Sequence, residues 1–202
     1  MSRWKAAPLV CALGLALLGV NALAAEVTPS PEPLQPLPQL AWRSYLGTWY
    51  QVAWIPNRFQ SACVSDTQAR YRALPNGVEV LNRCKTAKGG WDEALGLARA
   101  VPGVSAFQGE VLSPAQLEVS FVPAFLRGLG VGWGAYWVIS RPDHGRYAVV
   151  SEPSRRYLWV LSRTPTLGGQ DRRAVDALLQ AQGFDLSRVV EHPHTEGSDG
   201  LR

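Results

Sequence analysis

The feature that most constrains the fold of this chain is a series of short segments in which apolar and polar residues alternate. The clearest runs from Val64 to Leu74, with a polar side chain at every second position from Asp66 to Arg72. An Asn-Gly pair, typical of a tight hairpin, follows it, and Val78 to Lys85 alternates in the same way. A period of two predicts β-strands with one buried face, because successive side chains point to opposite faces of a sheet.

Eight segments of this kind follow one another, and turn residues rather than helical patterns separate them. We expect strands over residues 48–54, 64–74, 78–85, 91–101, 116–121, 135–141, 146–151 and 157–162. Strands at this spacing favour an antiparallel up-and-down meander. Eight antiparallel strands can close into a barrel just wide enough for one small ligand, and closure removes the exposed sheet edges.

The periodicity changes after the eighth strand. From Gln170 to Gln182 apolar residues recur at helical spacing, and Gly183 follows as a stop signal. We therefore predict an all-β fold with one helix. It is an eight-stranded antiparallel up-and-down β-barrel with a C-terminal amphipathic α-helix packed outside.

The first 24 residues predict a secretory signal peptide. Arg3 and Lys5 form a positive n-region, an apolar stretch follows, and Ala22-Leu23-Ala24 is a small-x-small cleavage site. An uncleaved membrane anchor is the alternative. Residues 25–41 carry five prolines and predict a flexible leader. Residues 42–191 form the predicted domain, and residues 192–202 a disordered polar tail.

The charge of the chain argues against a nucleic-acid partner. The formal net charge of +4 falls to +2 without the two basic residues of the signal peptide, and no Lys/Arg run of the kind that follows phosphates is present. No catalytic or metal-ligating constellation stands out either. His144 lies in a predicted turn, and His192 and His194 lie in the predicted tail. We expect no enzymatic activity, no cofactor and no metal.

Two cysteines, Cys63 and Cys84, remain after the signal peptide. In an oxidising compartment they predict a disulfide, with a reactive thiol as the alternative. The register of the predicted hairpin places Cys84 nearer to Thr67 than to Cys63. A bridge therefore requires a bulge or a loop that curls back.

Barrel topology assigns roles to two further residues. Strand 1 begins, and strand 8 ends, at the same end of an up-and-down barrel, which we call the closed end. Trp49, near the start of strand 1, and Arg163, just after strand 8, should meet there because closure makes these strands neighbours. An arginine over an indole ring stabilises by roughly 0.5–2 kcal/mol, so we predict a structural role for both residues.

The other end is the open end, where a ligand would enter. We predict that the ligand-binding wall comprises Trp54, Phe59, Ala69, Tyr71, Val78, Val80, Asn82, Val119, Phe121, Tyr136 and Val138. We predict that the mouth comprises Asn57, Arg58, Phe125, Arg127 and Trp133. Such a wall suits an acyl chain, whose burial contributes about 0.8 kcal/mol per methylene. The apolar stretch 123–134 is either a self-packed lid or a lip that contacts lipid or a membrane surface.

Several motifs resemble one known family. Gly47-Thr48-Trp49-Tyr50 resembles the G-x-W motif of lipocalins, and Tyr157 to Pro165 resembles their last-strand segment, which ends in an arginine, here Arg163. Residues 69–84, 118–125, 135–140 and 151–165 are similar to the bacterial outer-membrane lipocalins, relatives of apolipoprotein D. The likeness extends from about Trp42 to Arg188.

The resemblance implies a calyx that binds fatty acids or lysophospholipids, with a role in membrane maintenance or stress. The signal peptide predicts an exported protein, and together with the resemblance it indicates the periplasm or the periplasmic face of the outer membrane. We expect a monomer or weak homodimer that contacts a membrane surface. Such relatives are often lipoproteins, but Cys11 lies inside the apolar stretch and we do not expect it to be lipidated.

Two alternatives stay open. The first is a small integral outer-membrane β-barrel, which should be apolar outside and polar inside. The second is a lipocalin enzyme that uses a free calyx cysteine as a nucleophile.

Overall fold

The structure is a computed structural model that describes residues 32–75 and 77–195. The predictions for the signal peptide, for Cys11, for the first part of the leader and for residues 196–202 lie outside this range. Within it, no helix has the length and apolarity needed to cross a membrane.

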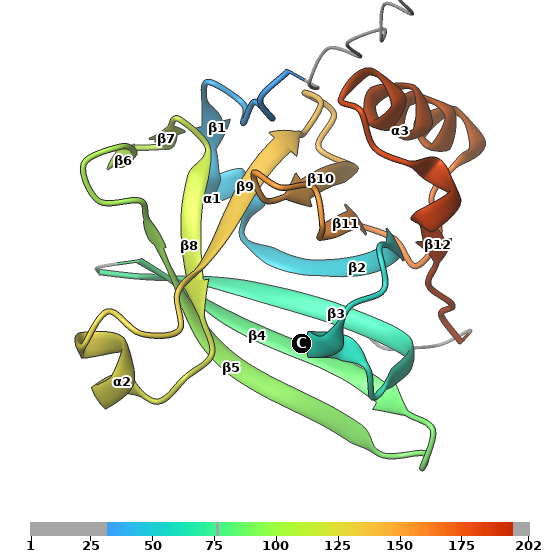
Figure 1. The fold of residues 1–202 in the computed structure, drawn as a ribbon, viewed down its shortest axis with the longest axis horizontal. Helices are drawn as coiled ribbons and strands as arrows, with labels where there is room; N and C mark the ends of the chain where they lie inside the picture. Colours follow the sequence, from blue (N-terminus) through green and yellow to red (C-terminus); the bar gives the residue numbers. More distant parts are fainter. Residues whose placement is uncertain (1–31, 76, 196–202) are drawn as a thin grey trace, which may run out of the picture. The chain divides into compact units, whose positions relative to one another are not determined.

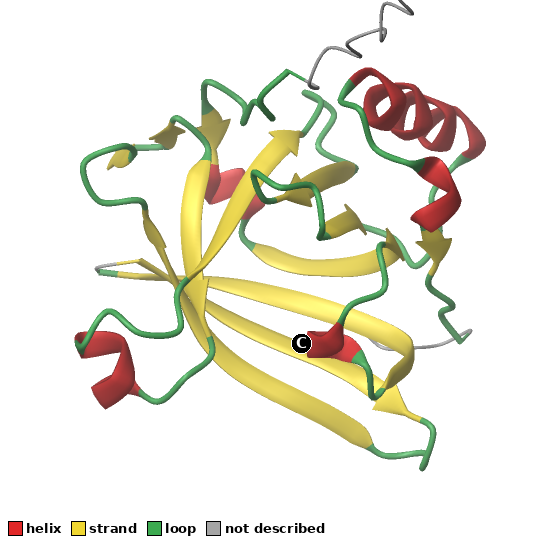
Figure 2. Cartoon of the chain, viewed as in Figure 1, coloured by secondary structure: helices red, strands yellow, loops and turns green. Residues whose placement is uncertain are grey.

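Eight strands form a closed antiparallel barrel (Figures 1 and 2). They are β2 (Gly47–Trp54), β3 (Cys63–Leu74), β4 (Gly77–Thr86), β5 (Trp91–Ala100), β8 (Gln116–Ser120), β9 (Gly134–Ser140), β10 (Tyr147–Ser151) and β11 (Leu158–Ser162). Each pairs with the next in chain order, and the pairing of β11 with β2 closes the barrel. The predicted meander is therefore confirmed, and each predicted strand end lies within one residue of the observed one.

The predicted helix is also confirmed, as α3 (Gly169–Ala181), and it packs outside the barrel (Figure 1). Val175 and Leu179 are buried against Val52 and Val160 on the outer faces of β2 and β11. All five residues of β10 are buried, because one face lines the barrel and the other belongs to the cluster beneath α3. A strand buried on both faces loses its polar alternation.

A second, small sheet covers the closed end. It consists of β1 (Leu40–Ala41), β7 (Val111–Ser113) and β6 (Ala106–Gln108), paired in that order, and α1 (Trp42–Tyr45) follows β1. The connection between β5 and β8 supplies β6 and β7. The closed end is thus sealed by segments that precede β2 in the sequence, β1 and α1, and by segments that follow it, β6 and β7.

The prediction of a flexible leader is wrong for residues 32–41. Leu34 and Leu40 are each 3% exposed. The backbone N–H of Leu37 donates to Val138 O at 2.8 Å, and its carbonyl accepts from Ala115 N at 2.9 Å. Leucines at every third position lie on one side of a proline-rich extended chain, which turns once in three residues. That side packs on the barrel.

The prediction of a disordered tail is wrong for residues 192–195. β2 pairs with β3 only from Gly47 to Tyr50, so residues 51–54 and 63–67 diverge and leave a gap, here called the seam. β12 (Val190–Glu191) pairs with β2 in the seam, and the next residues continue it. His192 N donates to Val52 O at 3.0 Å, and Asp66 N donates to Pro193 O at 2.9 Å. Unpaired strand edges need hydrogen-bond partners, and this segment supplies them.

Candidate ligand-binding site

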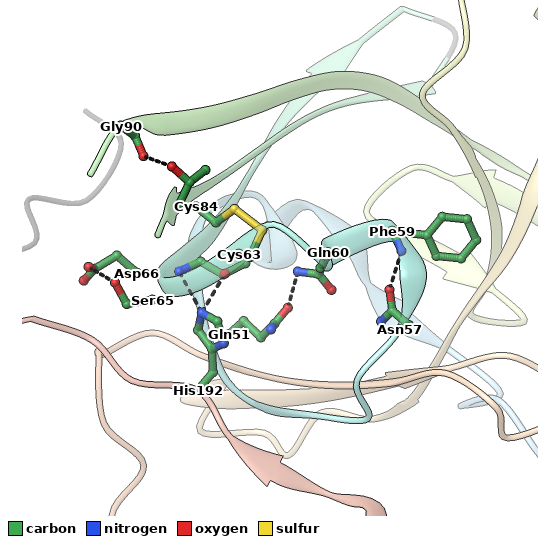
Figure 3. The surroundings of a disulfide bond; sticks show 12 residues. Gln51, Asn57, Phe59, Gln60, Cys63, Ser65, Asp66, Cys84, Gly90 and His192 are labelled. Carbon is green, nitrogen blue, oxygen red and sulfur yellow. Dashed lines mark hydrogen bonds between the residues drawn. A yellow bond between two sulfur atoms is a disulfide. The ribbon is translucent and has the colours of Figure 1, made fainter. Parts of the chain in front are cut away.

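Cys63 and Cys84 form a disulfide at the open end, with their Cα atoms 5.4 Å apart (Figure 3). The β3–β4 pairing is interrupted between Cys63 and Ser65 and again between Ser65 and Gln68. These irregularities supply the bulge that the predicted register required. The disulfide is confirmed, and the alternative of a free thiol at either of these cysteines is wrong.

At the closed end, Arg163 covers Trp49. The guanidinium carbon lies 3.7 Å from the indole centroid, and Trp49 has no exposed surface. Arg163 donates to the carbonyls of Thr48 at 2.7 Å, Ser44 at 2.8 Å and Leu46 at 2.9 Å. Burial lowers the pKa of Arg163 to about 10, so it stays charged at neutral pH. The predicted pairing is present, and it ties the end of β11 to α1 and the start of β2.

Above this plug, three buried tyrosine hydroxyls form a chain. Tyr136 Oη lies 2.7 Å from Tyr45 Oη and 2.8 Å from Tyr71 Oη. Burial raises the pKa of Tyr71 to about 12 and raises the pKa values of the other two well above their usual range, so all three stay neutral. Each hydroxyl carries one donor, and the two hydrogen bonds use two of the three.

The space around the tyrosines is small and otherwise apolar. The cavity measures about 20 Å³, roughly the space of one water molecule. Its other lining residues are Leu40, Trp42, Leu46, Val78, Val80, Ala98, Phe107, Leu117 and Val119. The lower barrel is therefore filled by the chain's own side chains.

Most of the predicted wall residues face the barrel interior. The inner cluster includes Ala69, Tyr71, Val78, Val80, Val119, Tyr136 and Val138. Asn82 lies opposite Ala69 in the β3–β4 ladder, and therefore on the same face. The ring of Phe121 packs so closely on Gly96 that a Cβ there would lie 2.7 Å from it. Trp54 lies opposite Trp159, which packs on the inner cluster, and therefore on the same face.

Phe59 does not belong to the wall. It lies in the short helix η1 (Arg58–Gln60) of the β2–β3 connection, with 62% of its surface exposed, and its ring is 5.4 Å from that of Tyr157. The position of Phe59 after the first strand did not reveal that Pro56 and the following turn direct the chain away from the barrel interior. Phe59 is a residue of the mouth.

At the mouth, two of the predicted polar residues form hydrogen bonds within their own loops. Asn57 Oδ1 accepts from Phe59 N at 3.0 Å and so caps η1. Arg127 donates to Val122 O at 2.9 Å, within the connection between β8 and β9. Trp133 lies beneath Arg99, whose guanidinium carbon is 3.9 Å from a ring centroid of the indole.

The apolar stretch 123–134 is not a self-packed lid. Phe125, in α2 (Ala124–Gly128), is 71% exposed, and Leu129 and Val131 are 75% and 52% exposed. Arg58, on the β2–β3 connection, lies over the Phe59 ring at 5.1 Å. The open end therefore presents exposed apolar side chains beside arginines.

Sequence reasoning missed one polar group inside the upper barrel. Gln51 follows Trp49 by two residues on the inner face of β2, and it lies opposite Leu161 of the inner cluster. Trp159 Nε1 donates to Gln60 Oε1 at 2.7 Å, and Gln60 Nε2 donates to Gln51 Oε1 at 2.8 Å (the latter in Figure 3). Strand periodicity from Trp49 would have placed Gln51 inside.

A larger hollow of about 440 Å³ lies outside the barrel, between α3, the outer wall and the C-terminal segment. Its charged lining residues pair with each other, since Arg172 lies 3.0 Å from Asp176 and 2.7 Å from Glu191. The barrel interior, with its plugged floor and open rim, is the better candidate for a ligand site.

An antiparallel barrel with an apolar interior, plugged at one end and open at the other, defines a calyx-type binding protein. The chain belongs to the lipocalin family: the family model described as "Lipocalin-like domain" matches residues 40–194. The resemblance found in the sequence is therefore confirmed. Proteins of this family are mainly carriers of small hydrophobic ligands, which accords with a binding rather than an enzymatic role.

Individual relatives agree with this assignment. The chain is 35% identical to the outer membrane lipoprotein Blc of Vibrio cholerae over 167 residues, which is 79% of this chain and 86% of that protein. It is 33% identical to temperature-induced lipocalin-1 of Arabidopsis thaliana, over 75% of this chain and 78% of that one. Among solved structures, insecticyanin from Manduca sexta has a similar fold, with a TM-score of 0.63 at 17% identity over 84% of this chain and 88% of that one.

Proposed function

We propose that this protein binds and carries an elongated amphipathic lipid, a fatty acid or a lysophospholipid, in the cell envelope. The observation that carries the proposal is the apolar inner wall, closed below by Trp49 and Arg163 and open above. An integral outer-membrane barrel would instead have a polar interior, so the apolar wall favours the carrier. One class of relative is named an outer membrane lipoprotein and another apolipoprotein D, which supports an exported, lipid-related role.

The calyx is tested with two neighbouring substitutions on β5. Ala94 lies opposite Asn82 and therefore faces inward, whereas Leu95 points to the other face. Ala94→Trp should fill the upper barrel and abolish binding of palmitate and lysophosphatidylcholine. Leu95→Trp, which places the same indole on the outer face, should leave binding unchanged.

Native mass spectrometry of protein isolated from the periplasm, followed by lipid extraction, identifies the natural ligand and the oligomeric state, for which we propose a monomer or weak homodimer. A calyx that is isolated empty and binds neither lipid would overturn the proposed function.

Delivery or uptake of the lipid at a membrane surface completes the proposal, with a role in membrane maintenance under stress. The open end combines the exposed side chains of Phe125, Leu129 and Val131 with exposed basic residues on other connections of the same end, among them Arg58 and Arg156. Apolar insertion and attraction to anionic headgroups act together at such a surface.

Flotation with phosphatidylglycerol vesicles tests this contact. The double variant Phe125→Ser, Leu129→Ser should remain unbound, because its rim has lost apolar side chains that would insert. Val104→Ser serves as the control, since Val104 is 56% exposed but lies in the connection at the closed end. Equal vesicle binding by the double variant and the control would exclude a rim contact.

A further inference from the structure

The hydrogen-bond chain of Trp159, Gln60 and Gln51 has a direction. An indole nitrogen can only donate, so the Gln60 atom 2.7 Å from Trp159 Nε1 must be the amide oxygen. Gln60 therefore turns its nitrogen to Gln51, 2.8 Å away, and that nitrogen also can only donate. Gln51 must in turn present its oxygen to Gln60. Its own nitrogen, Nε2, is thereby directed away from the chain.

Gln51 Nε2 is buried and has no hydrogen-bond partner among the described residues. Gln51 as a whole is only 3% exposed. Buried amide groups in proteins normally find partners, so an unpaired donor held in one orientation needs an explanation. An acceptor supplied by a bound molecule would give this oriented donor its partner.

The position of Gln51 fits that role. It shares the inner face of β2 with Trp49, which plugs the floor, and it lies one inward position nearer the mouth. Leu161 is its partner across the β2–β11 ladder. Two of the three hydroxyl donors of the lower-barrel tyrosines are used between the tyrosines, whereas both amide hydrogens of Gln51 Nε2 are unused.

We propose that Gln51 Nε2 donates a hydrogen bond to an acceptor group of the ligand, a carboxylate or an ester carbonyl, and so selects acceptor-bearing lipids over plain hydrocarbons. The proposal rests on the proposed function, since it names the ligand class of the same calyx. Gln60 and Trp159 act as positioning residues that hold the amide in its orientation.

Three fluorescent probes of similar shape test the proposal. cis-Parinaric acid has a carboxylate, its methyl ester keeps a carbonyl without charge, and diphenylhexatriene has no acceptor. The wild-type protein should bind all three. Gln51→Met keeps the length of the side chain and removes its donor, so it should weaken the acid and the ester about tenfold to a hundredfold and leave diphenylhexatriene unchanged.

A second variant keeps the test decisive if Gln51→Met fails to fold. Gln51→Glu still accepts from Gln60 but presents an oxygen where the wild type presents N–H, so it should reject the acid and the ester and retain diphenylhexatriene. Equal effects on all three probes, or no effect on any, would overturn the role of Gln51 and leave the carrier function standing. Failure of the wild-type protein to bind any probe would overturn both.

Discussion

The guanidinium carbon of Arg163 lies 3.7 Å from the centroid of the Trp49 indole ring, and together these residues seal the closed end of the barrel. Trp49 donates from Nε1 to Tyr45 O at 2.7 Å, and Arg163 donates to Ser44 O, so both residues are anchored to α1. The pair joins the first and last barrel strands, whose meeting closes the sheet. We therefore expect it to act on folding and not on ligand contact.

Trp49→Ala should lower the free energy of unfolding by about 3–5 kcal/mol, because it removes a fully buried indole and leaves a cavity beneath Arg163. Urea denaturation followed by circular dichroism measures the loss, and Trp49→Phe should show a smaller one. Ligand binding should decline only in proportion to the unfolded fraction. A stable, fully folded Trp49→Ala protein without ligand binding would contradict the structural role.

The Cys63–Cys84 disulfide should stabilise the open end. It joins residues 21 apart in the sequence, and a loop of this length is expected to contribute about 3 kcal/mol. The double variant Cys63→Ser, Cys84→Ser should therefore unfold at lower urea concentration, by that amount. Alkylation with and without reduction checks the bond itself, and an equal mass under the two conditions would exclude it.

Leu40 should contribute as much to the stability of the fold as a buried residue of the barrel strands, although it lies in the proline-rich segment. Its side chain is 3% exposed and belongs to the inner cluster. Leu40→Ala should lower the free energy of unfolding by about 2–5 kcal/mol. Gln39→Ala, one residue earlier and exposed, should have little effect. Equal melting temperatures for the two variants would show that the segment does not hold the fold.

The seam should make the protein sensitive to acid through His192. Burial lowers the pKa of His192 to about 4, and the neighbouring His194 adds to the shift. The ring nitrogen Nε2 accepts from Thr67 Oγ1 at 2.7 Å, which requires the neutral ring. Two charged pairs surround the His192 ring. One is the buried Asp66 with Lys85, 3.7 Å apart, and the other is Glu191 with Arg172.

The unfolded chain takes up a proton near pH 6.5, whereas folded His192 does so only near pH 4. The stability that the neutral His192 ring contributes is thus fully present above pH 6.5 and is lost as the pH falls to 4, by about 3 kcal/mol. Urea denaturation at pH 7 and pH 4.5 should show the loss, and His192→Gln should show less of it. An unchanged pH dependence in His192→Gln would assign the effect to other groups.

Asp66 should act in a lower pH range than His192. Although burial alone would raise it, hydrogen bonds from Thr195 and Ser65 bring the pKa of Asp66 below its ordinary value. Its contribution is present above about pH 4 and is lost below that, so the two groups can be separated by measuring at pH 4.5 and at pH 3.

Local patterns were sufficient for the strands and the helix. The alternation from Val64 to Leu74 placed Ala69 and Tyr71 on the inner face, and the helical spacing after Gln170 placed α3. These signals are local because a side chain's face depends only on its position along its own strand or helix. The parity of an up-and-down barrel then brought Trp49 and Arg163 together.

The sequence by itself thus determined the strands, the closed barrel and its floor. Only the tertiary structure decided where the leader, the β2–β3 connection and the C-terminal segment pack. Leu40 joins the core, Phe59 turns outward, and His192 fills a seam that exists because β2 and β3 diverge after Tyr50. The Gln51 donor likewise depends on Gln60 and Trp159, which reach it from a loop and from a distant strand. Such contacts depend on which surfaces meet after folding, and no periodicity within one segment records them.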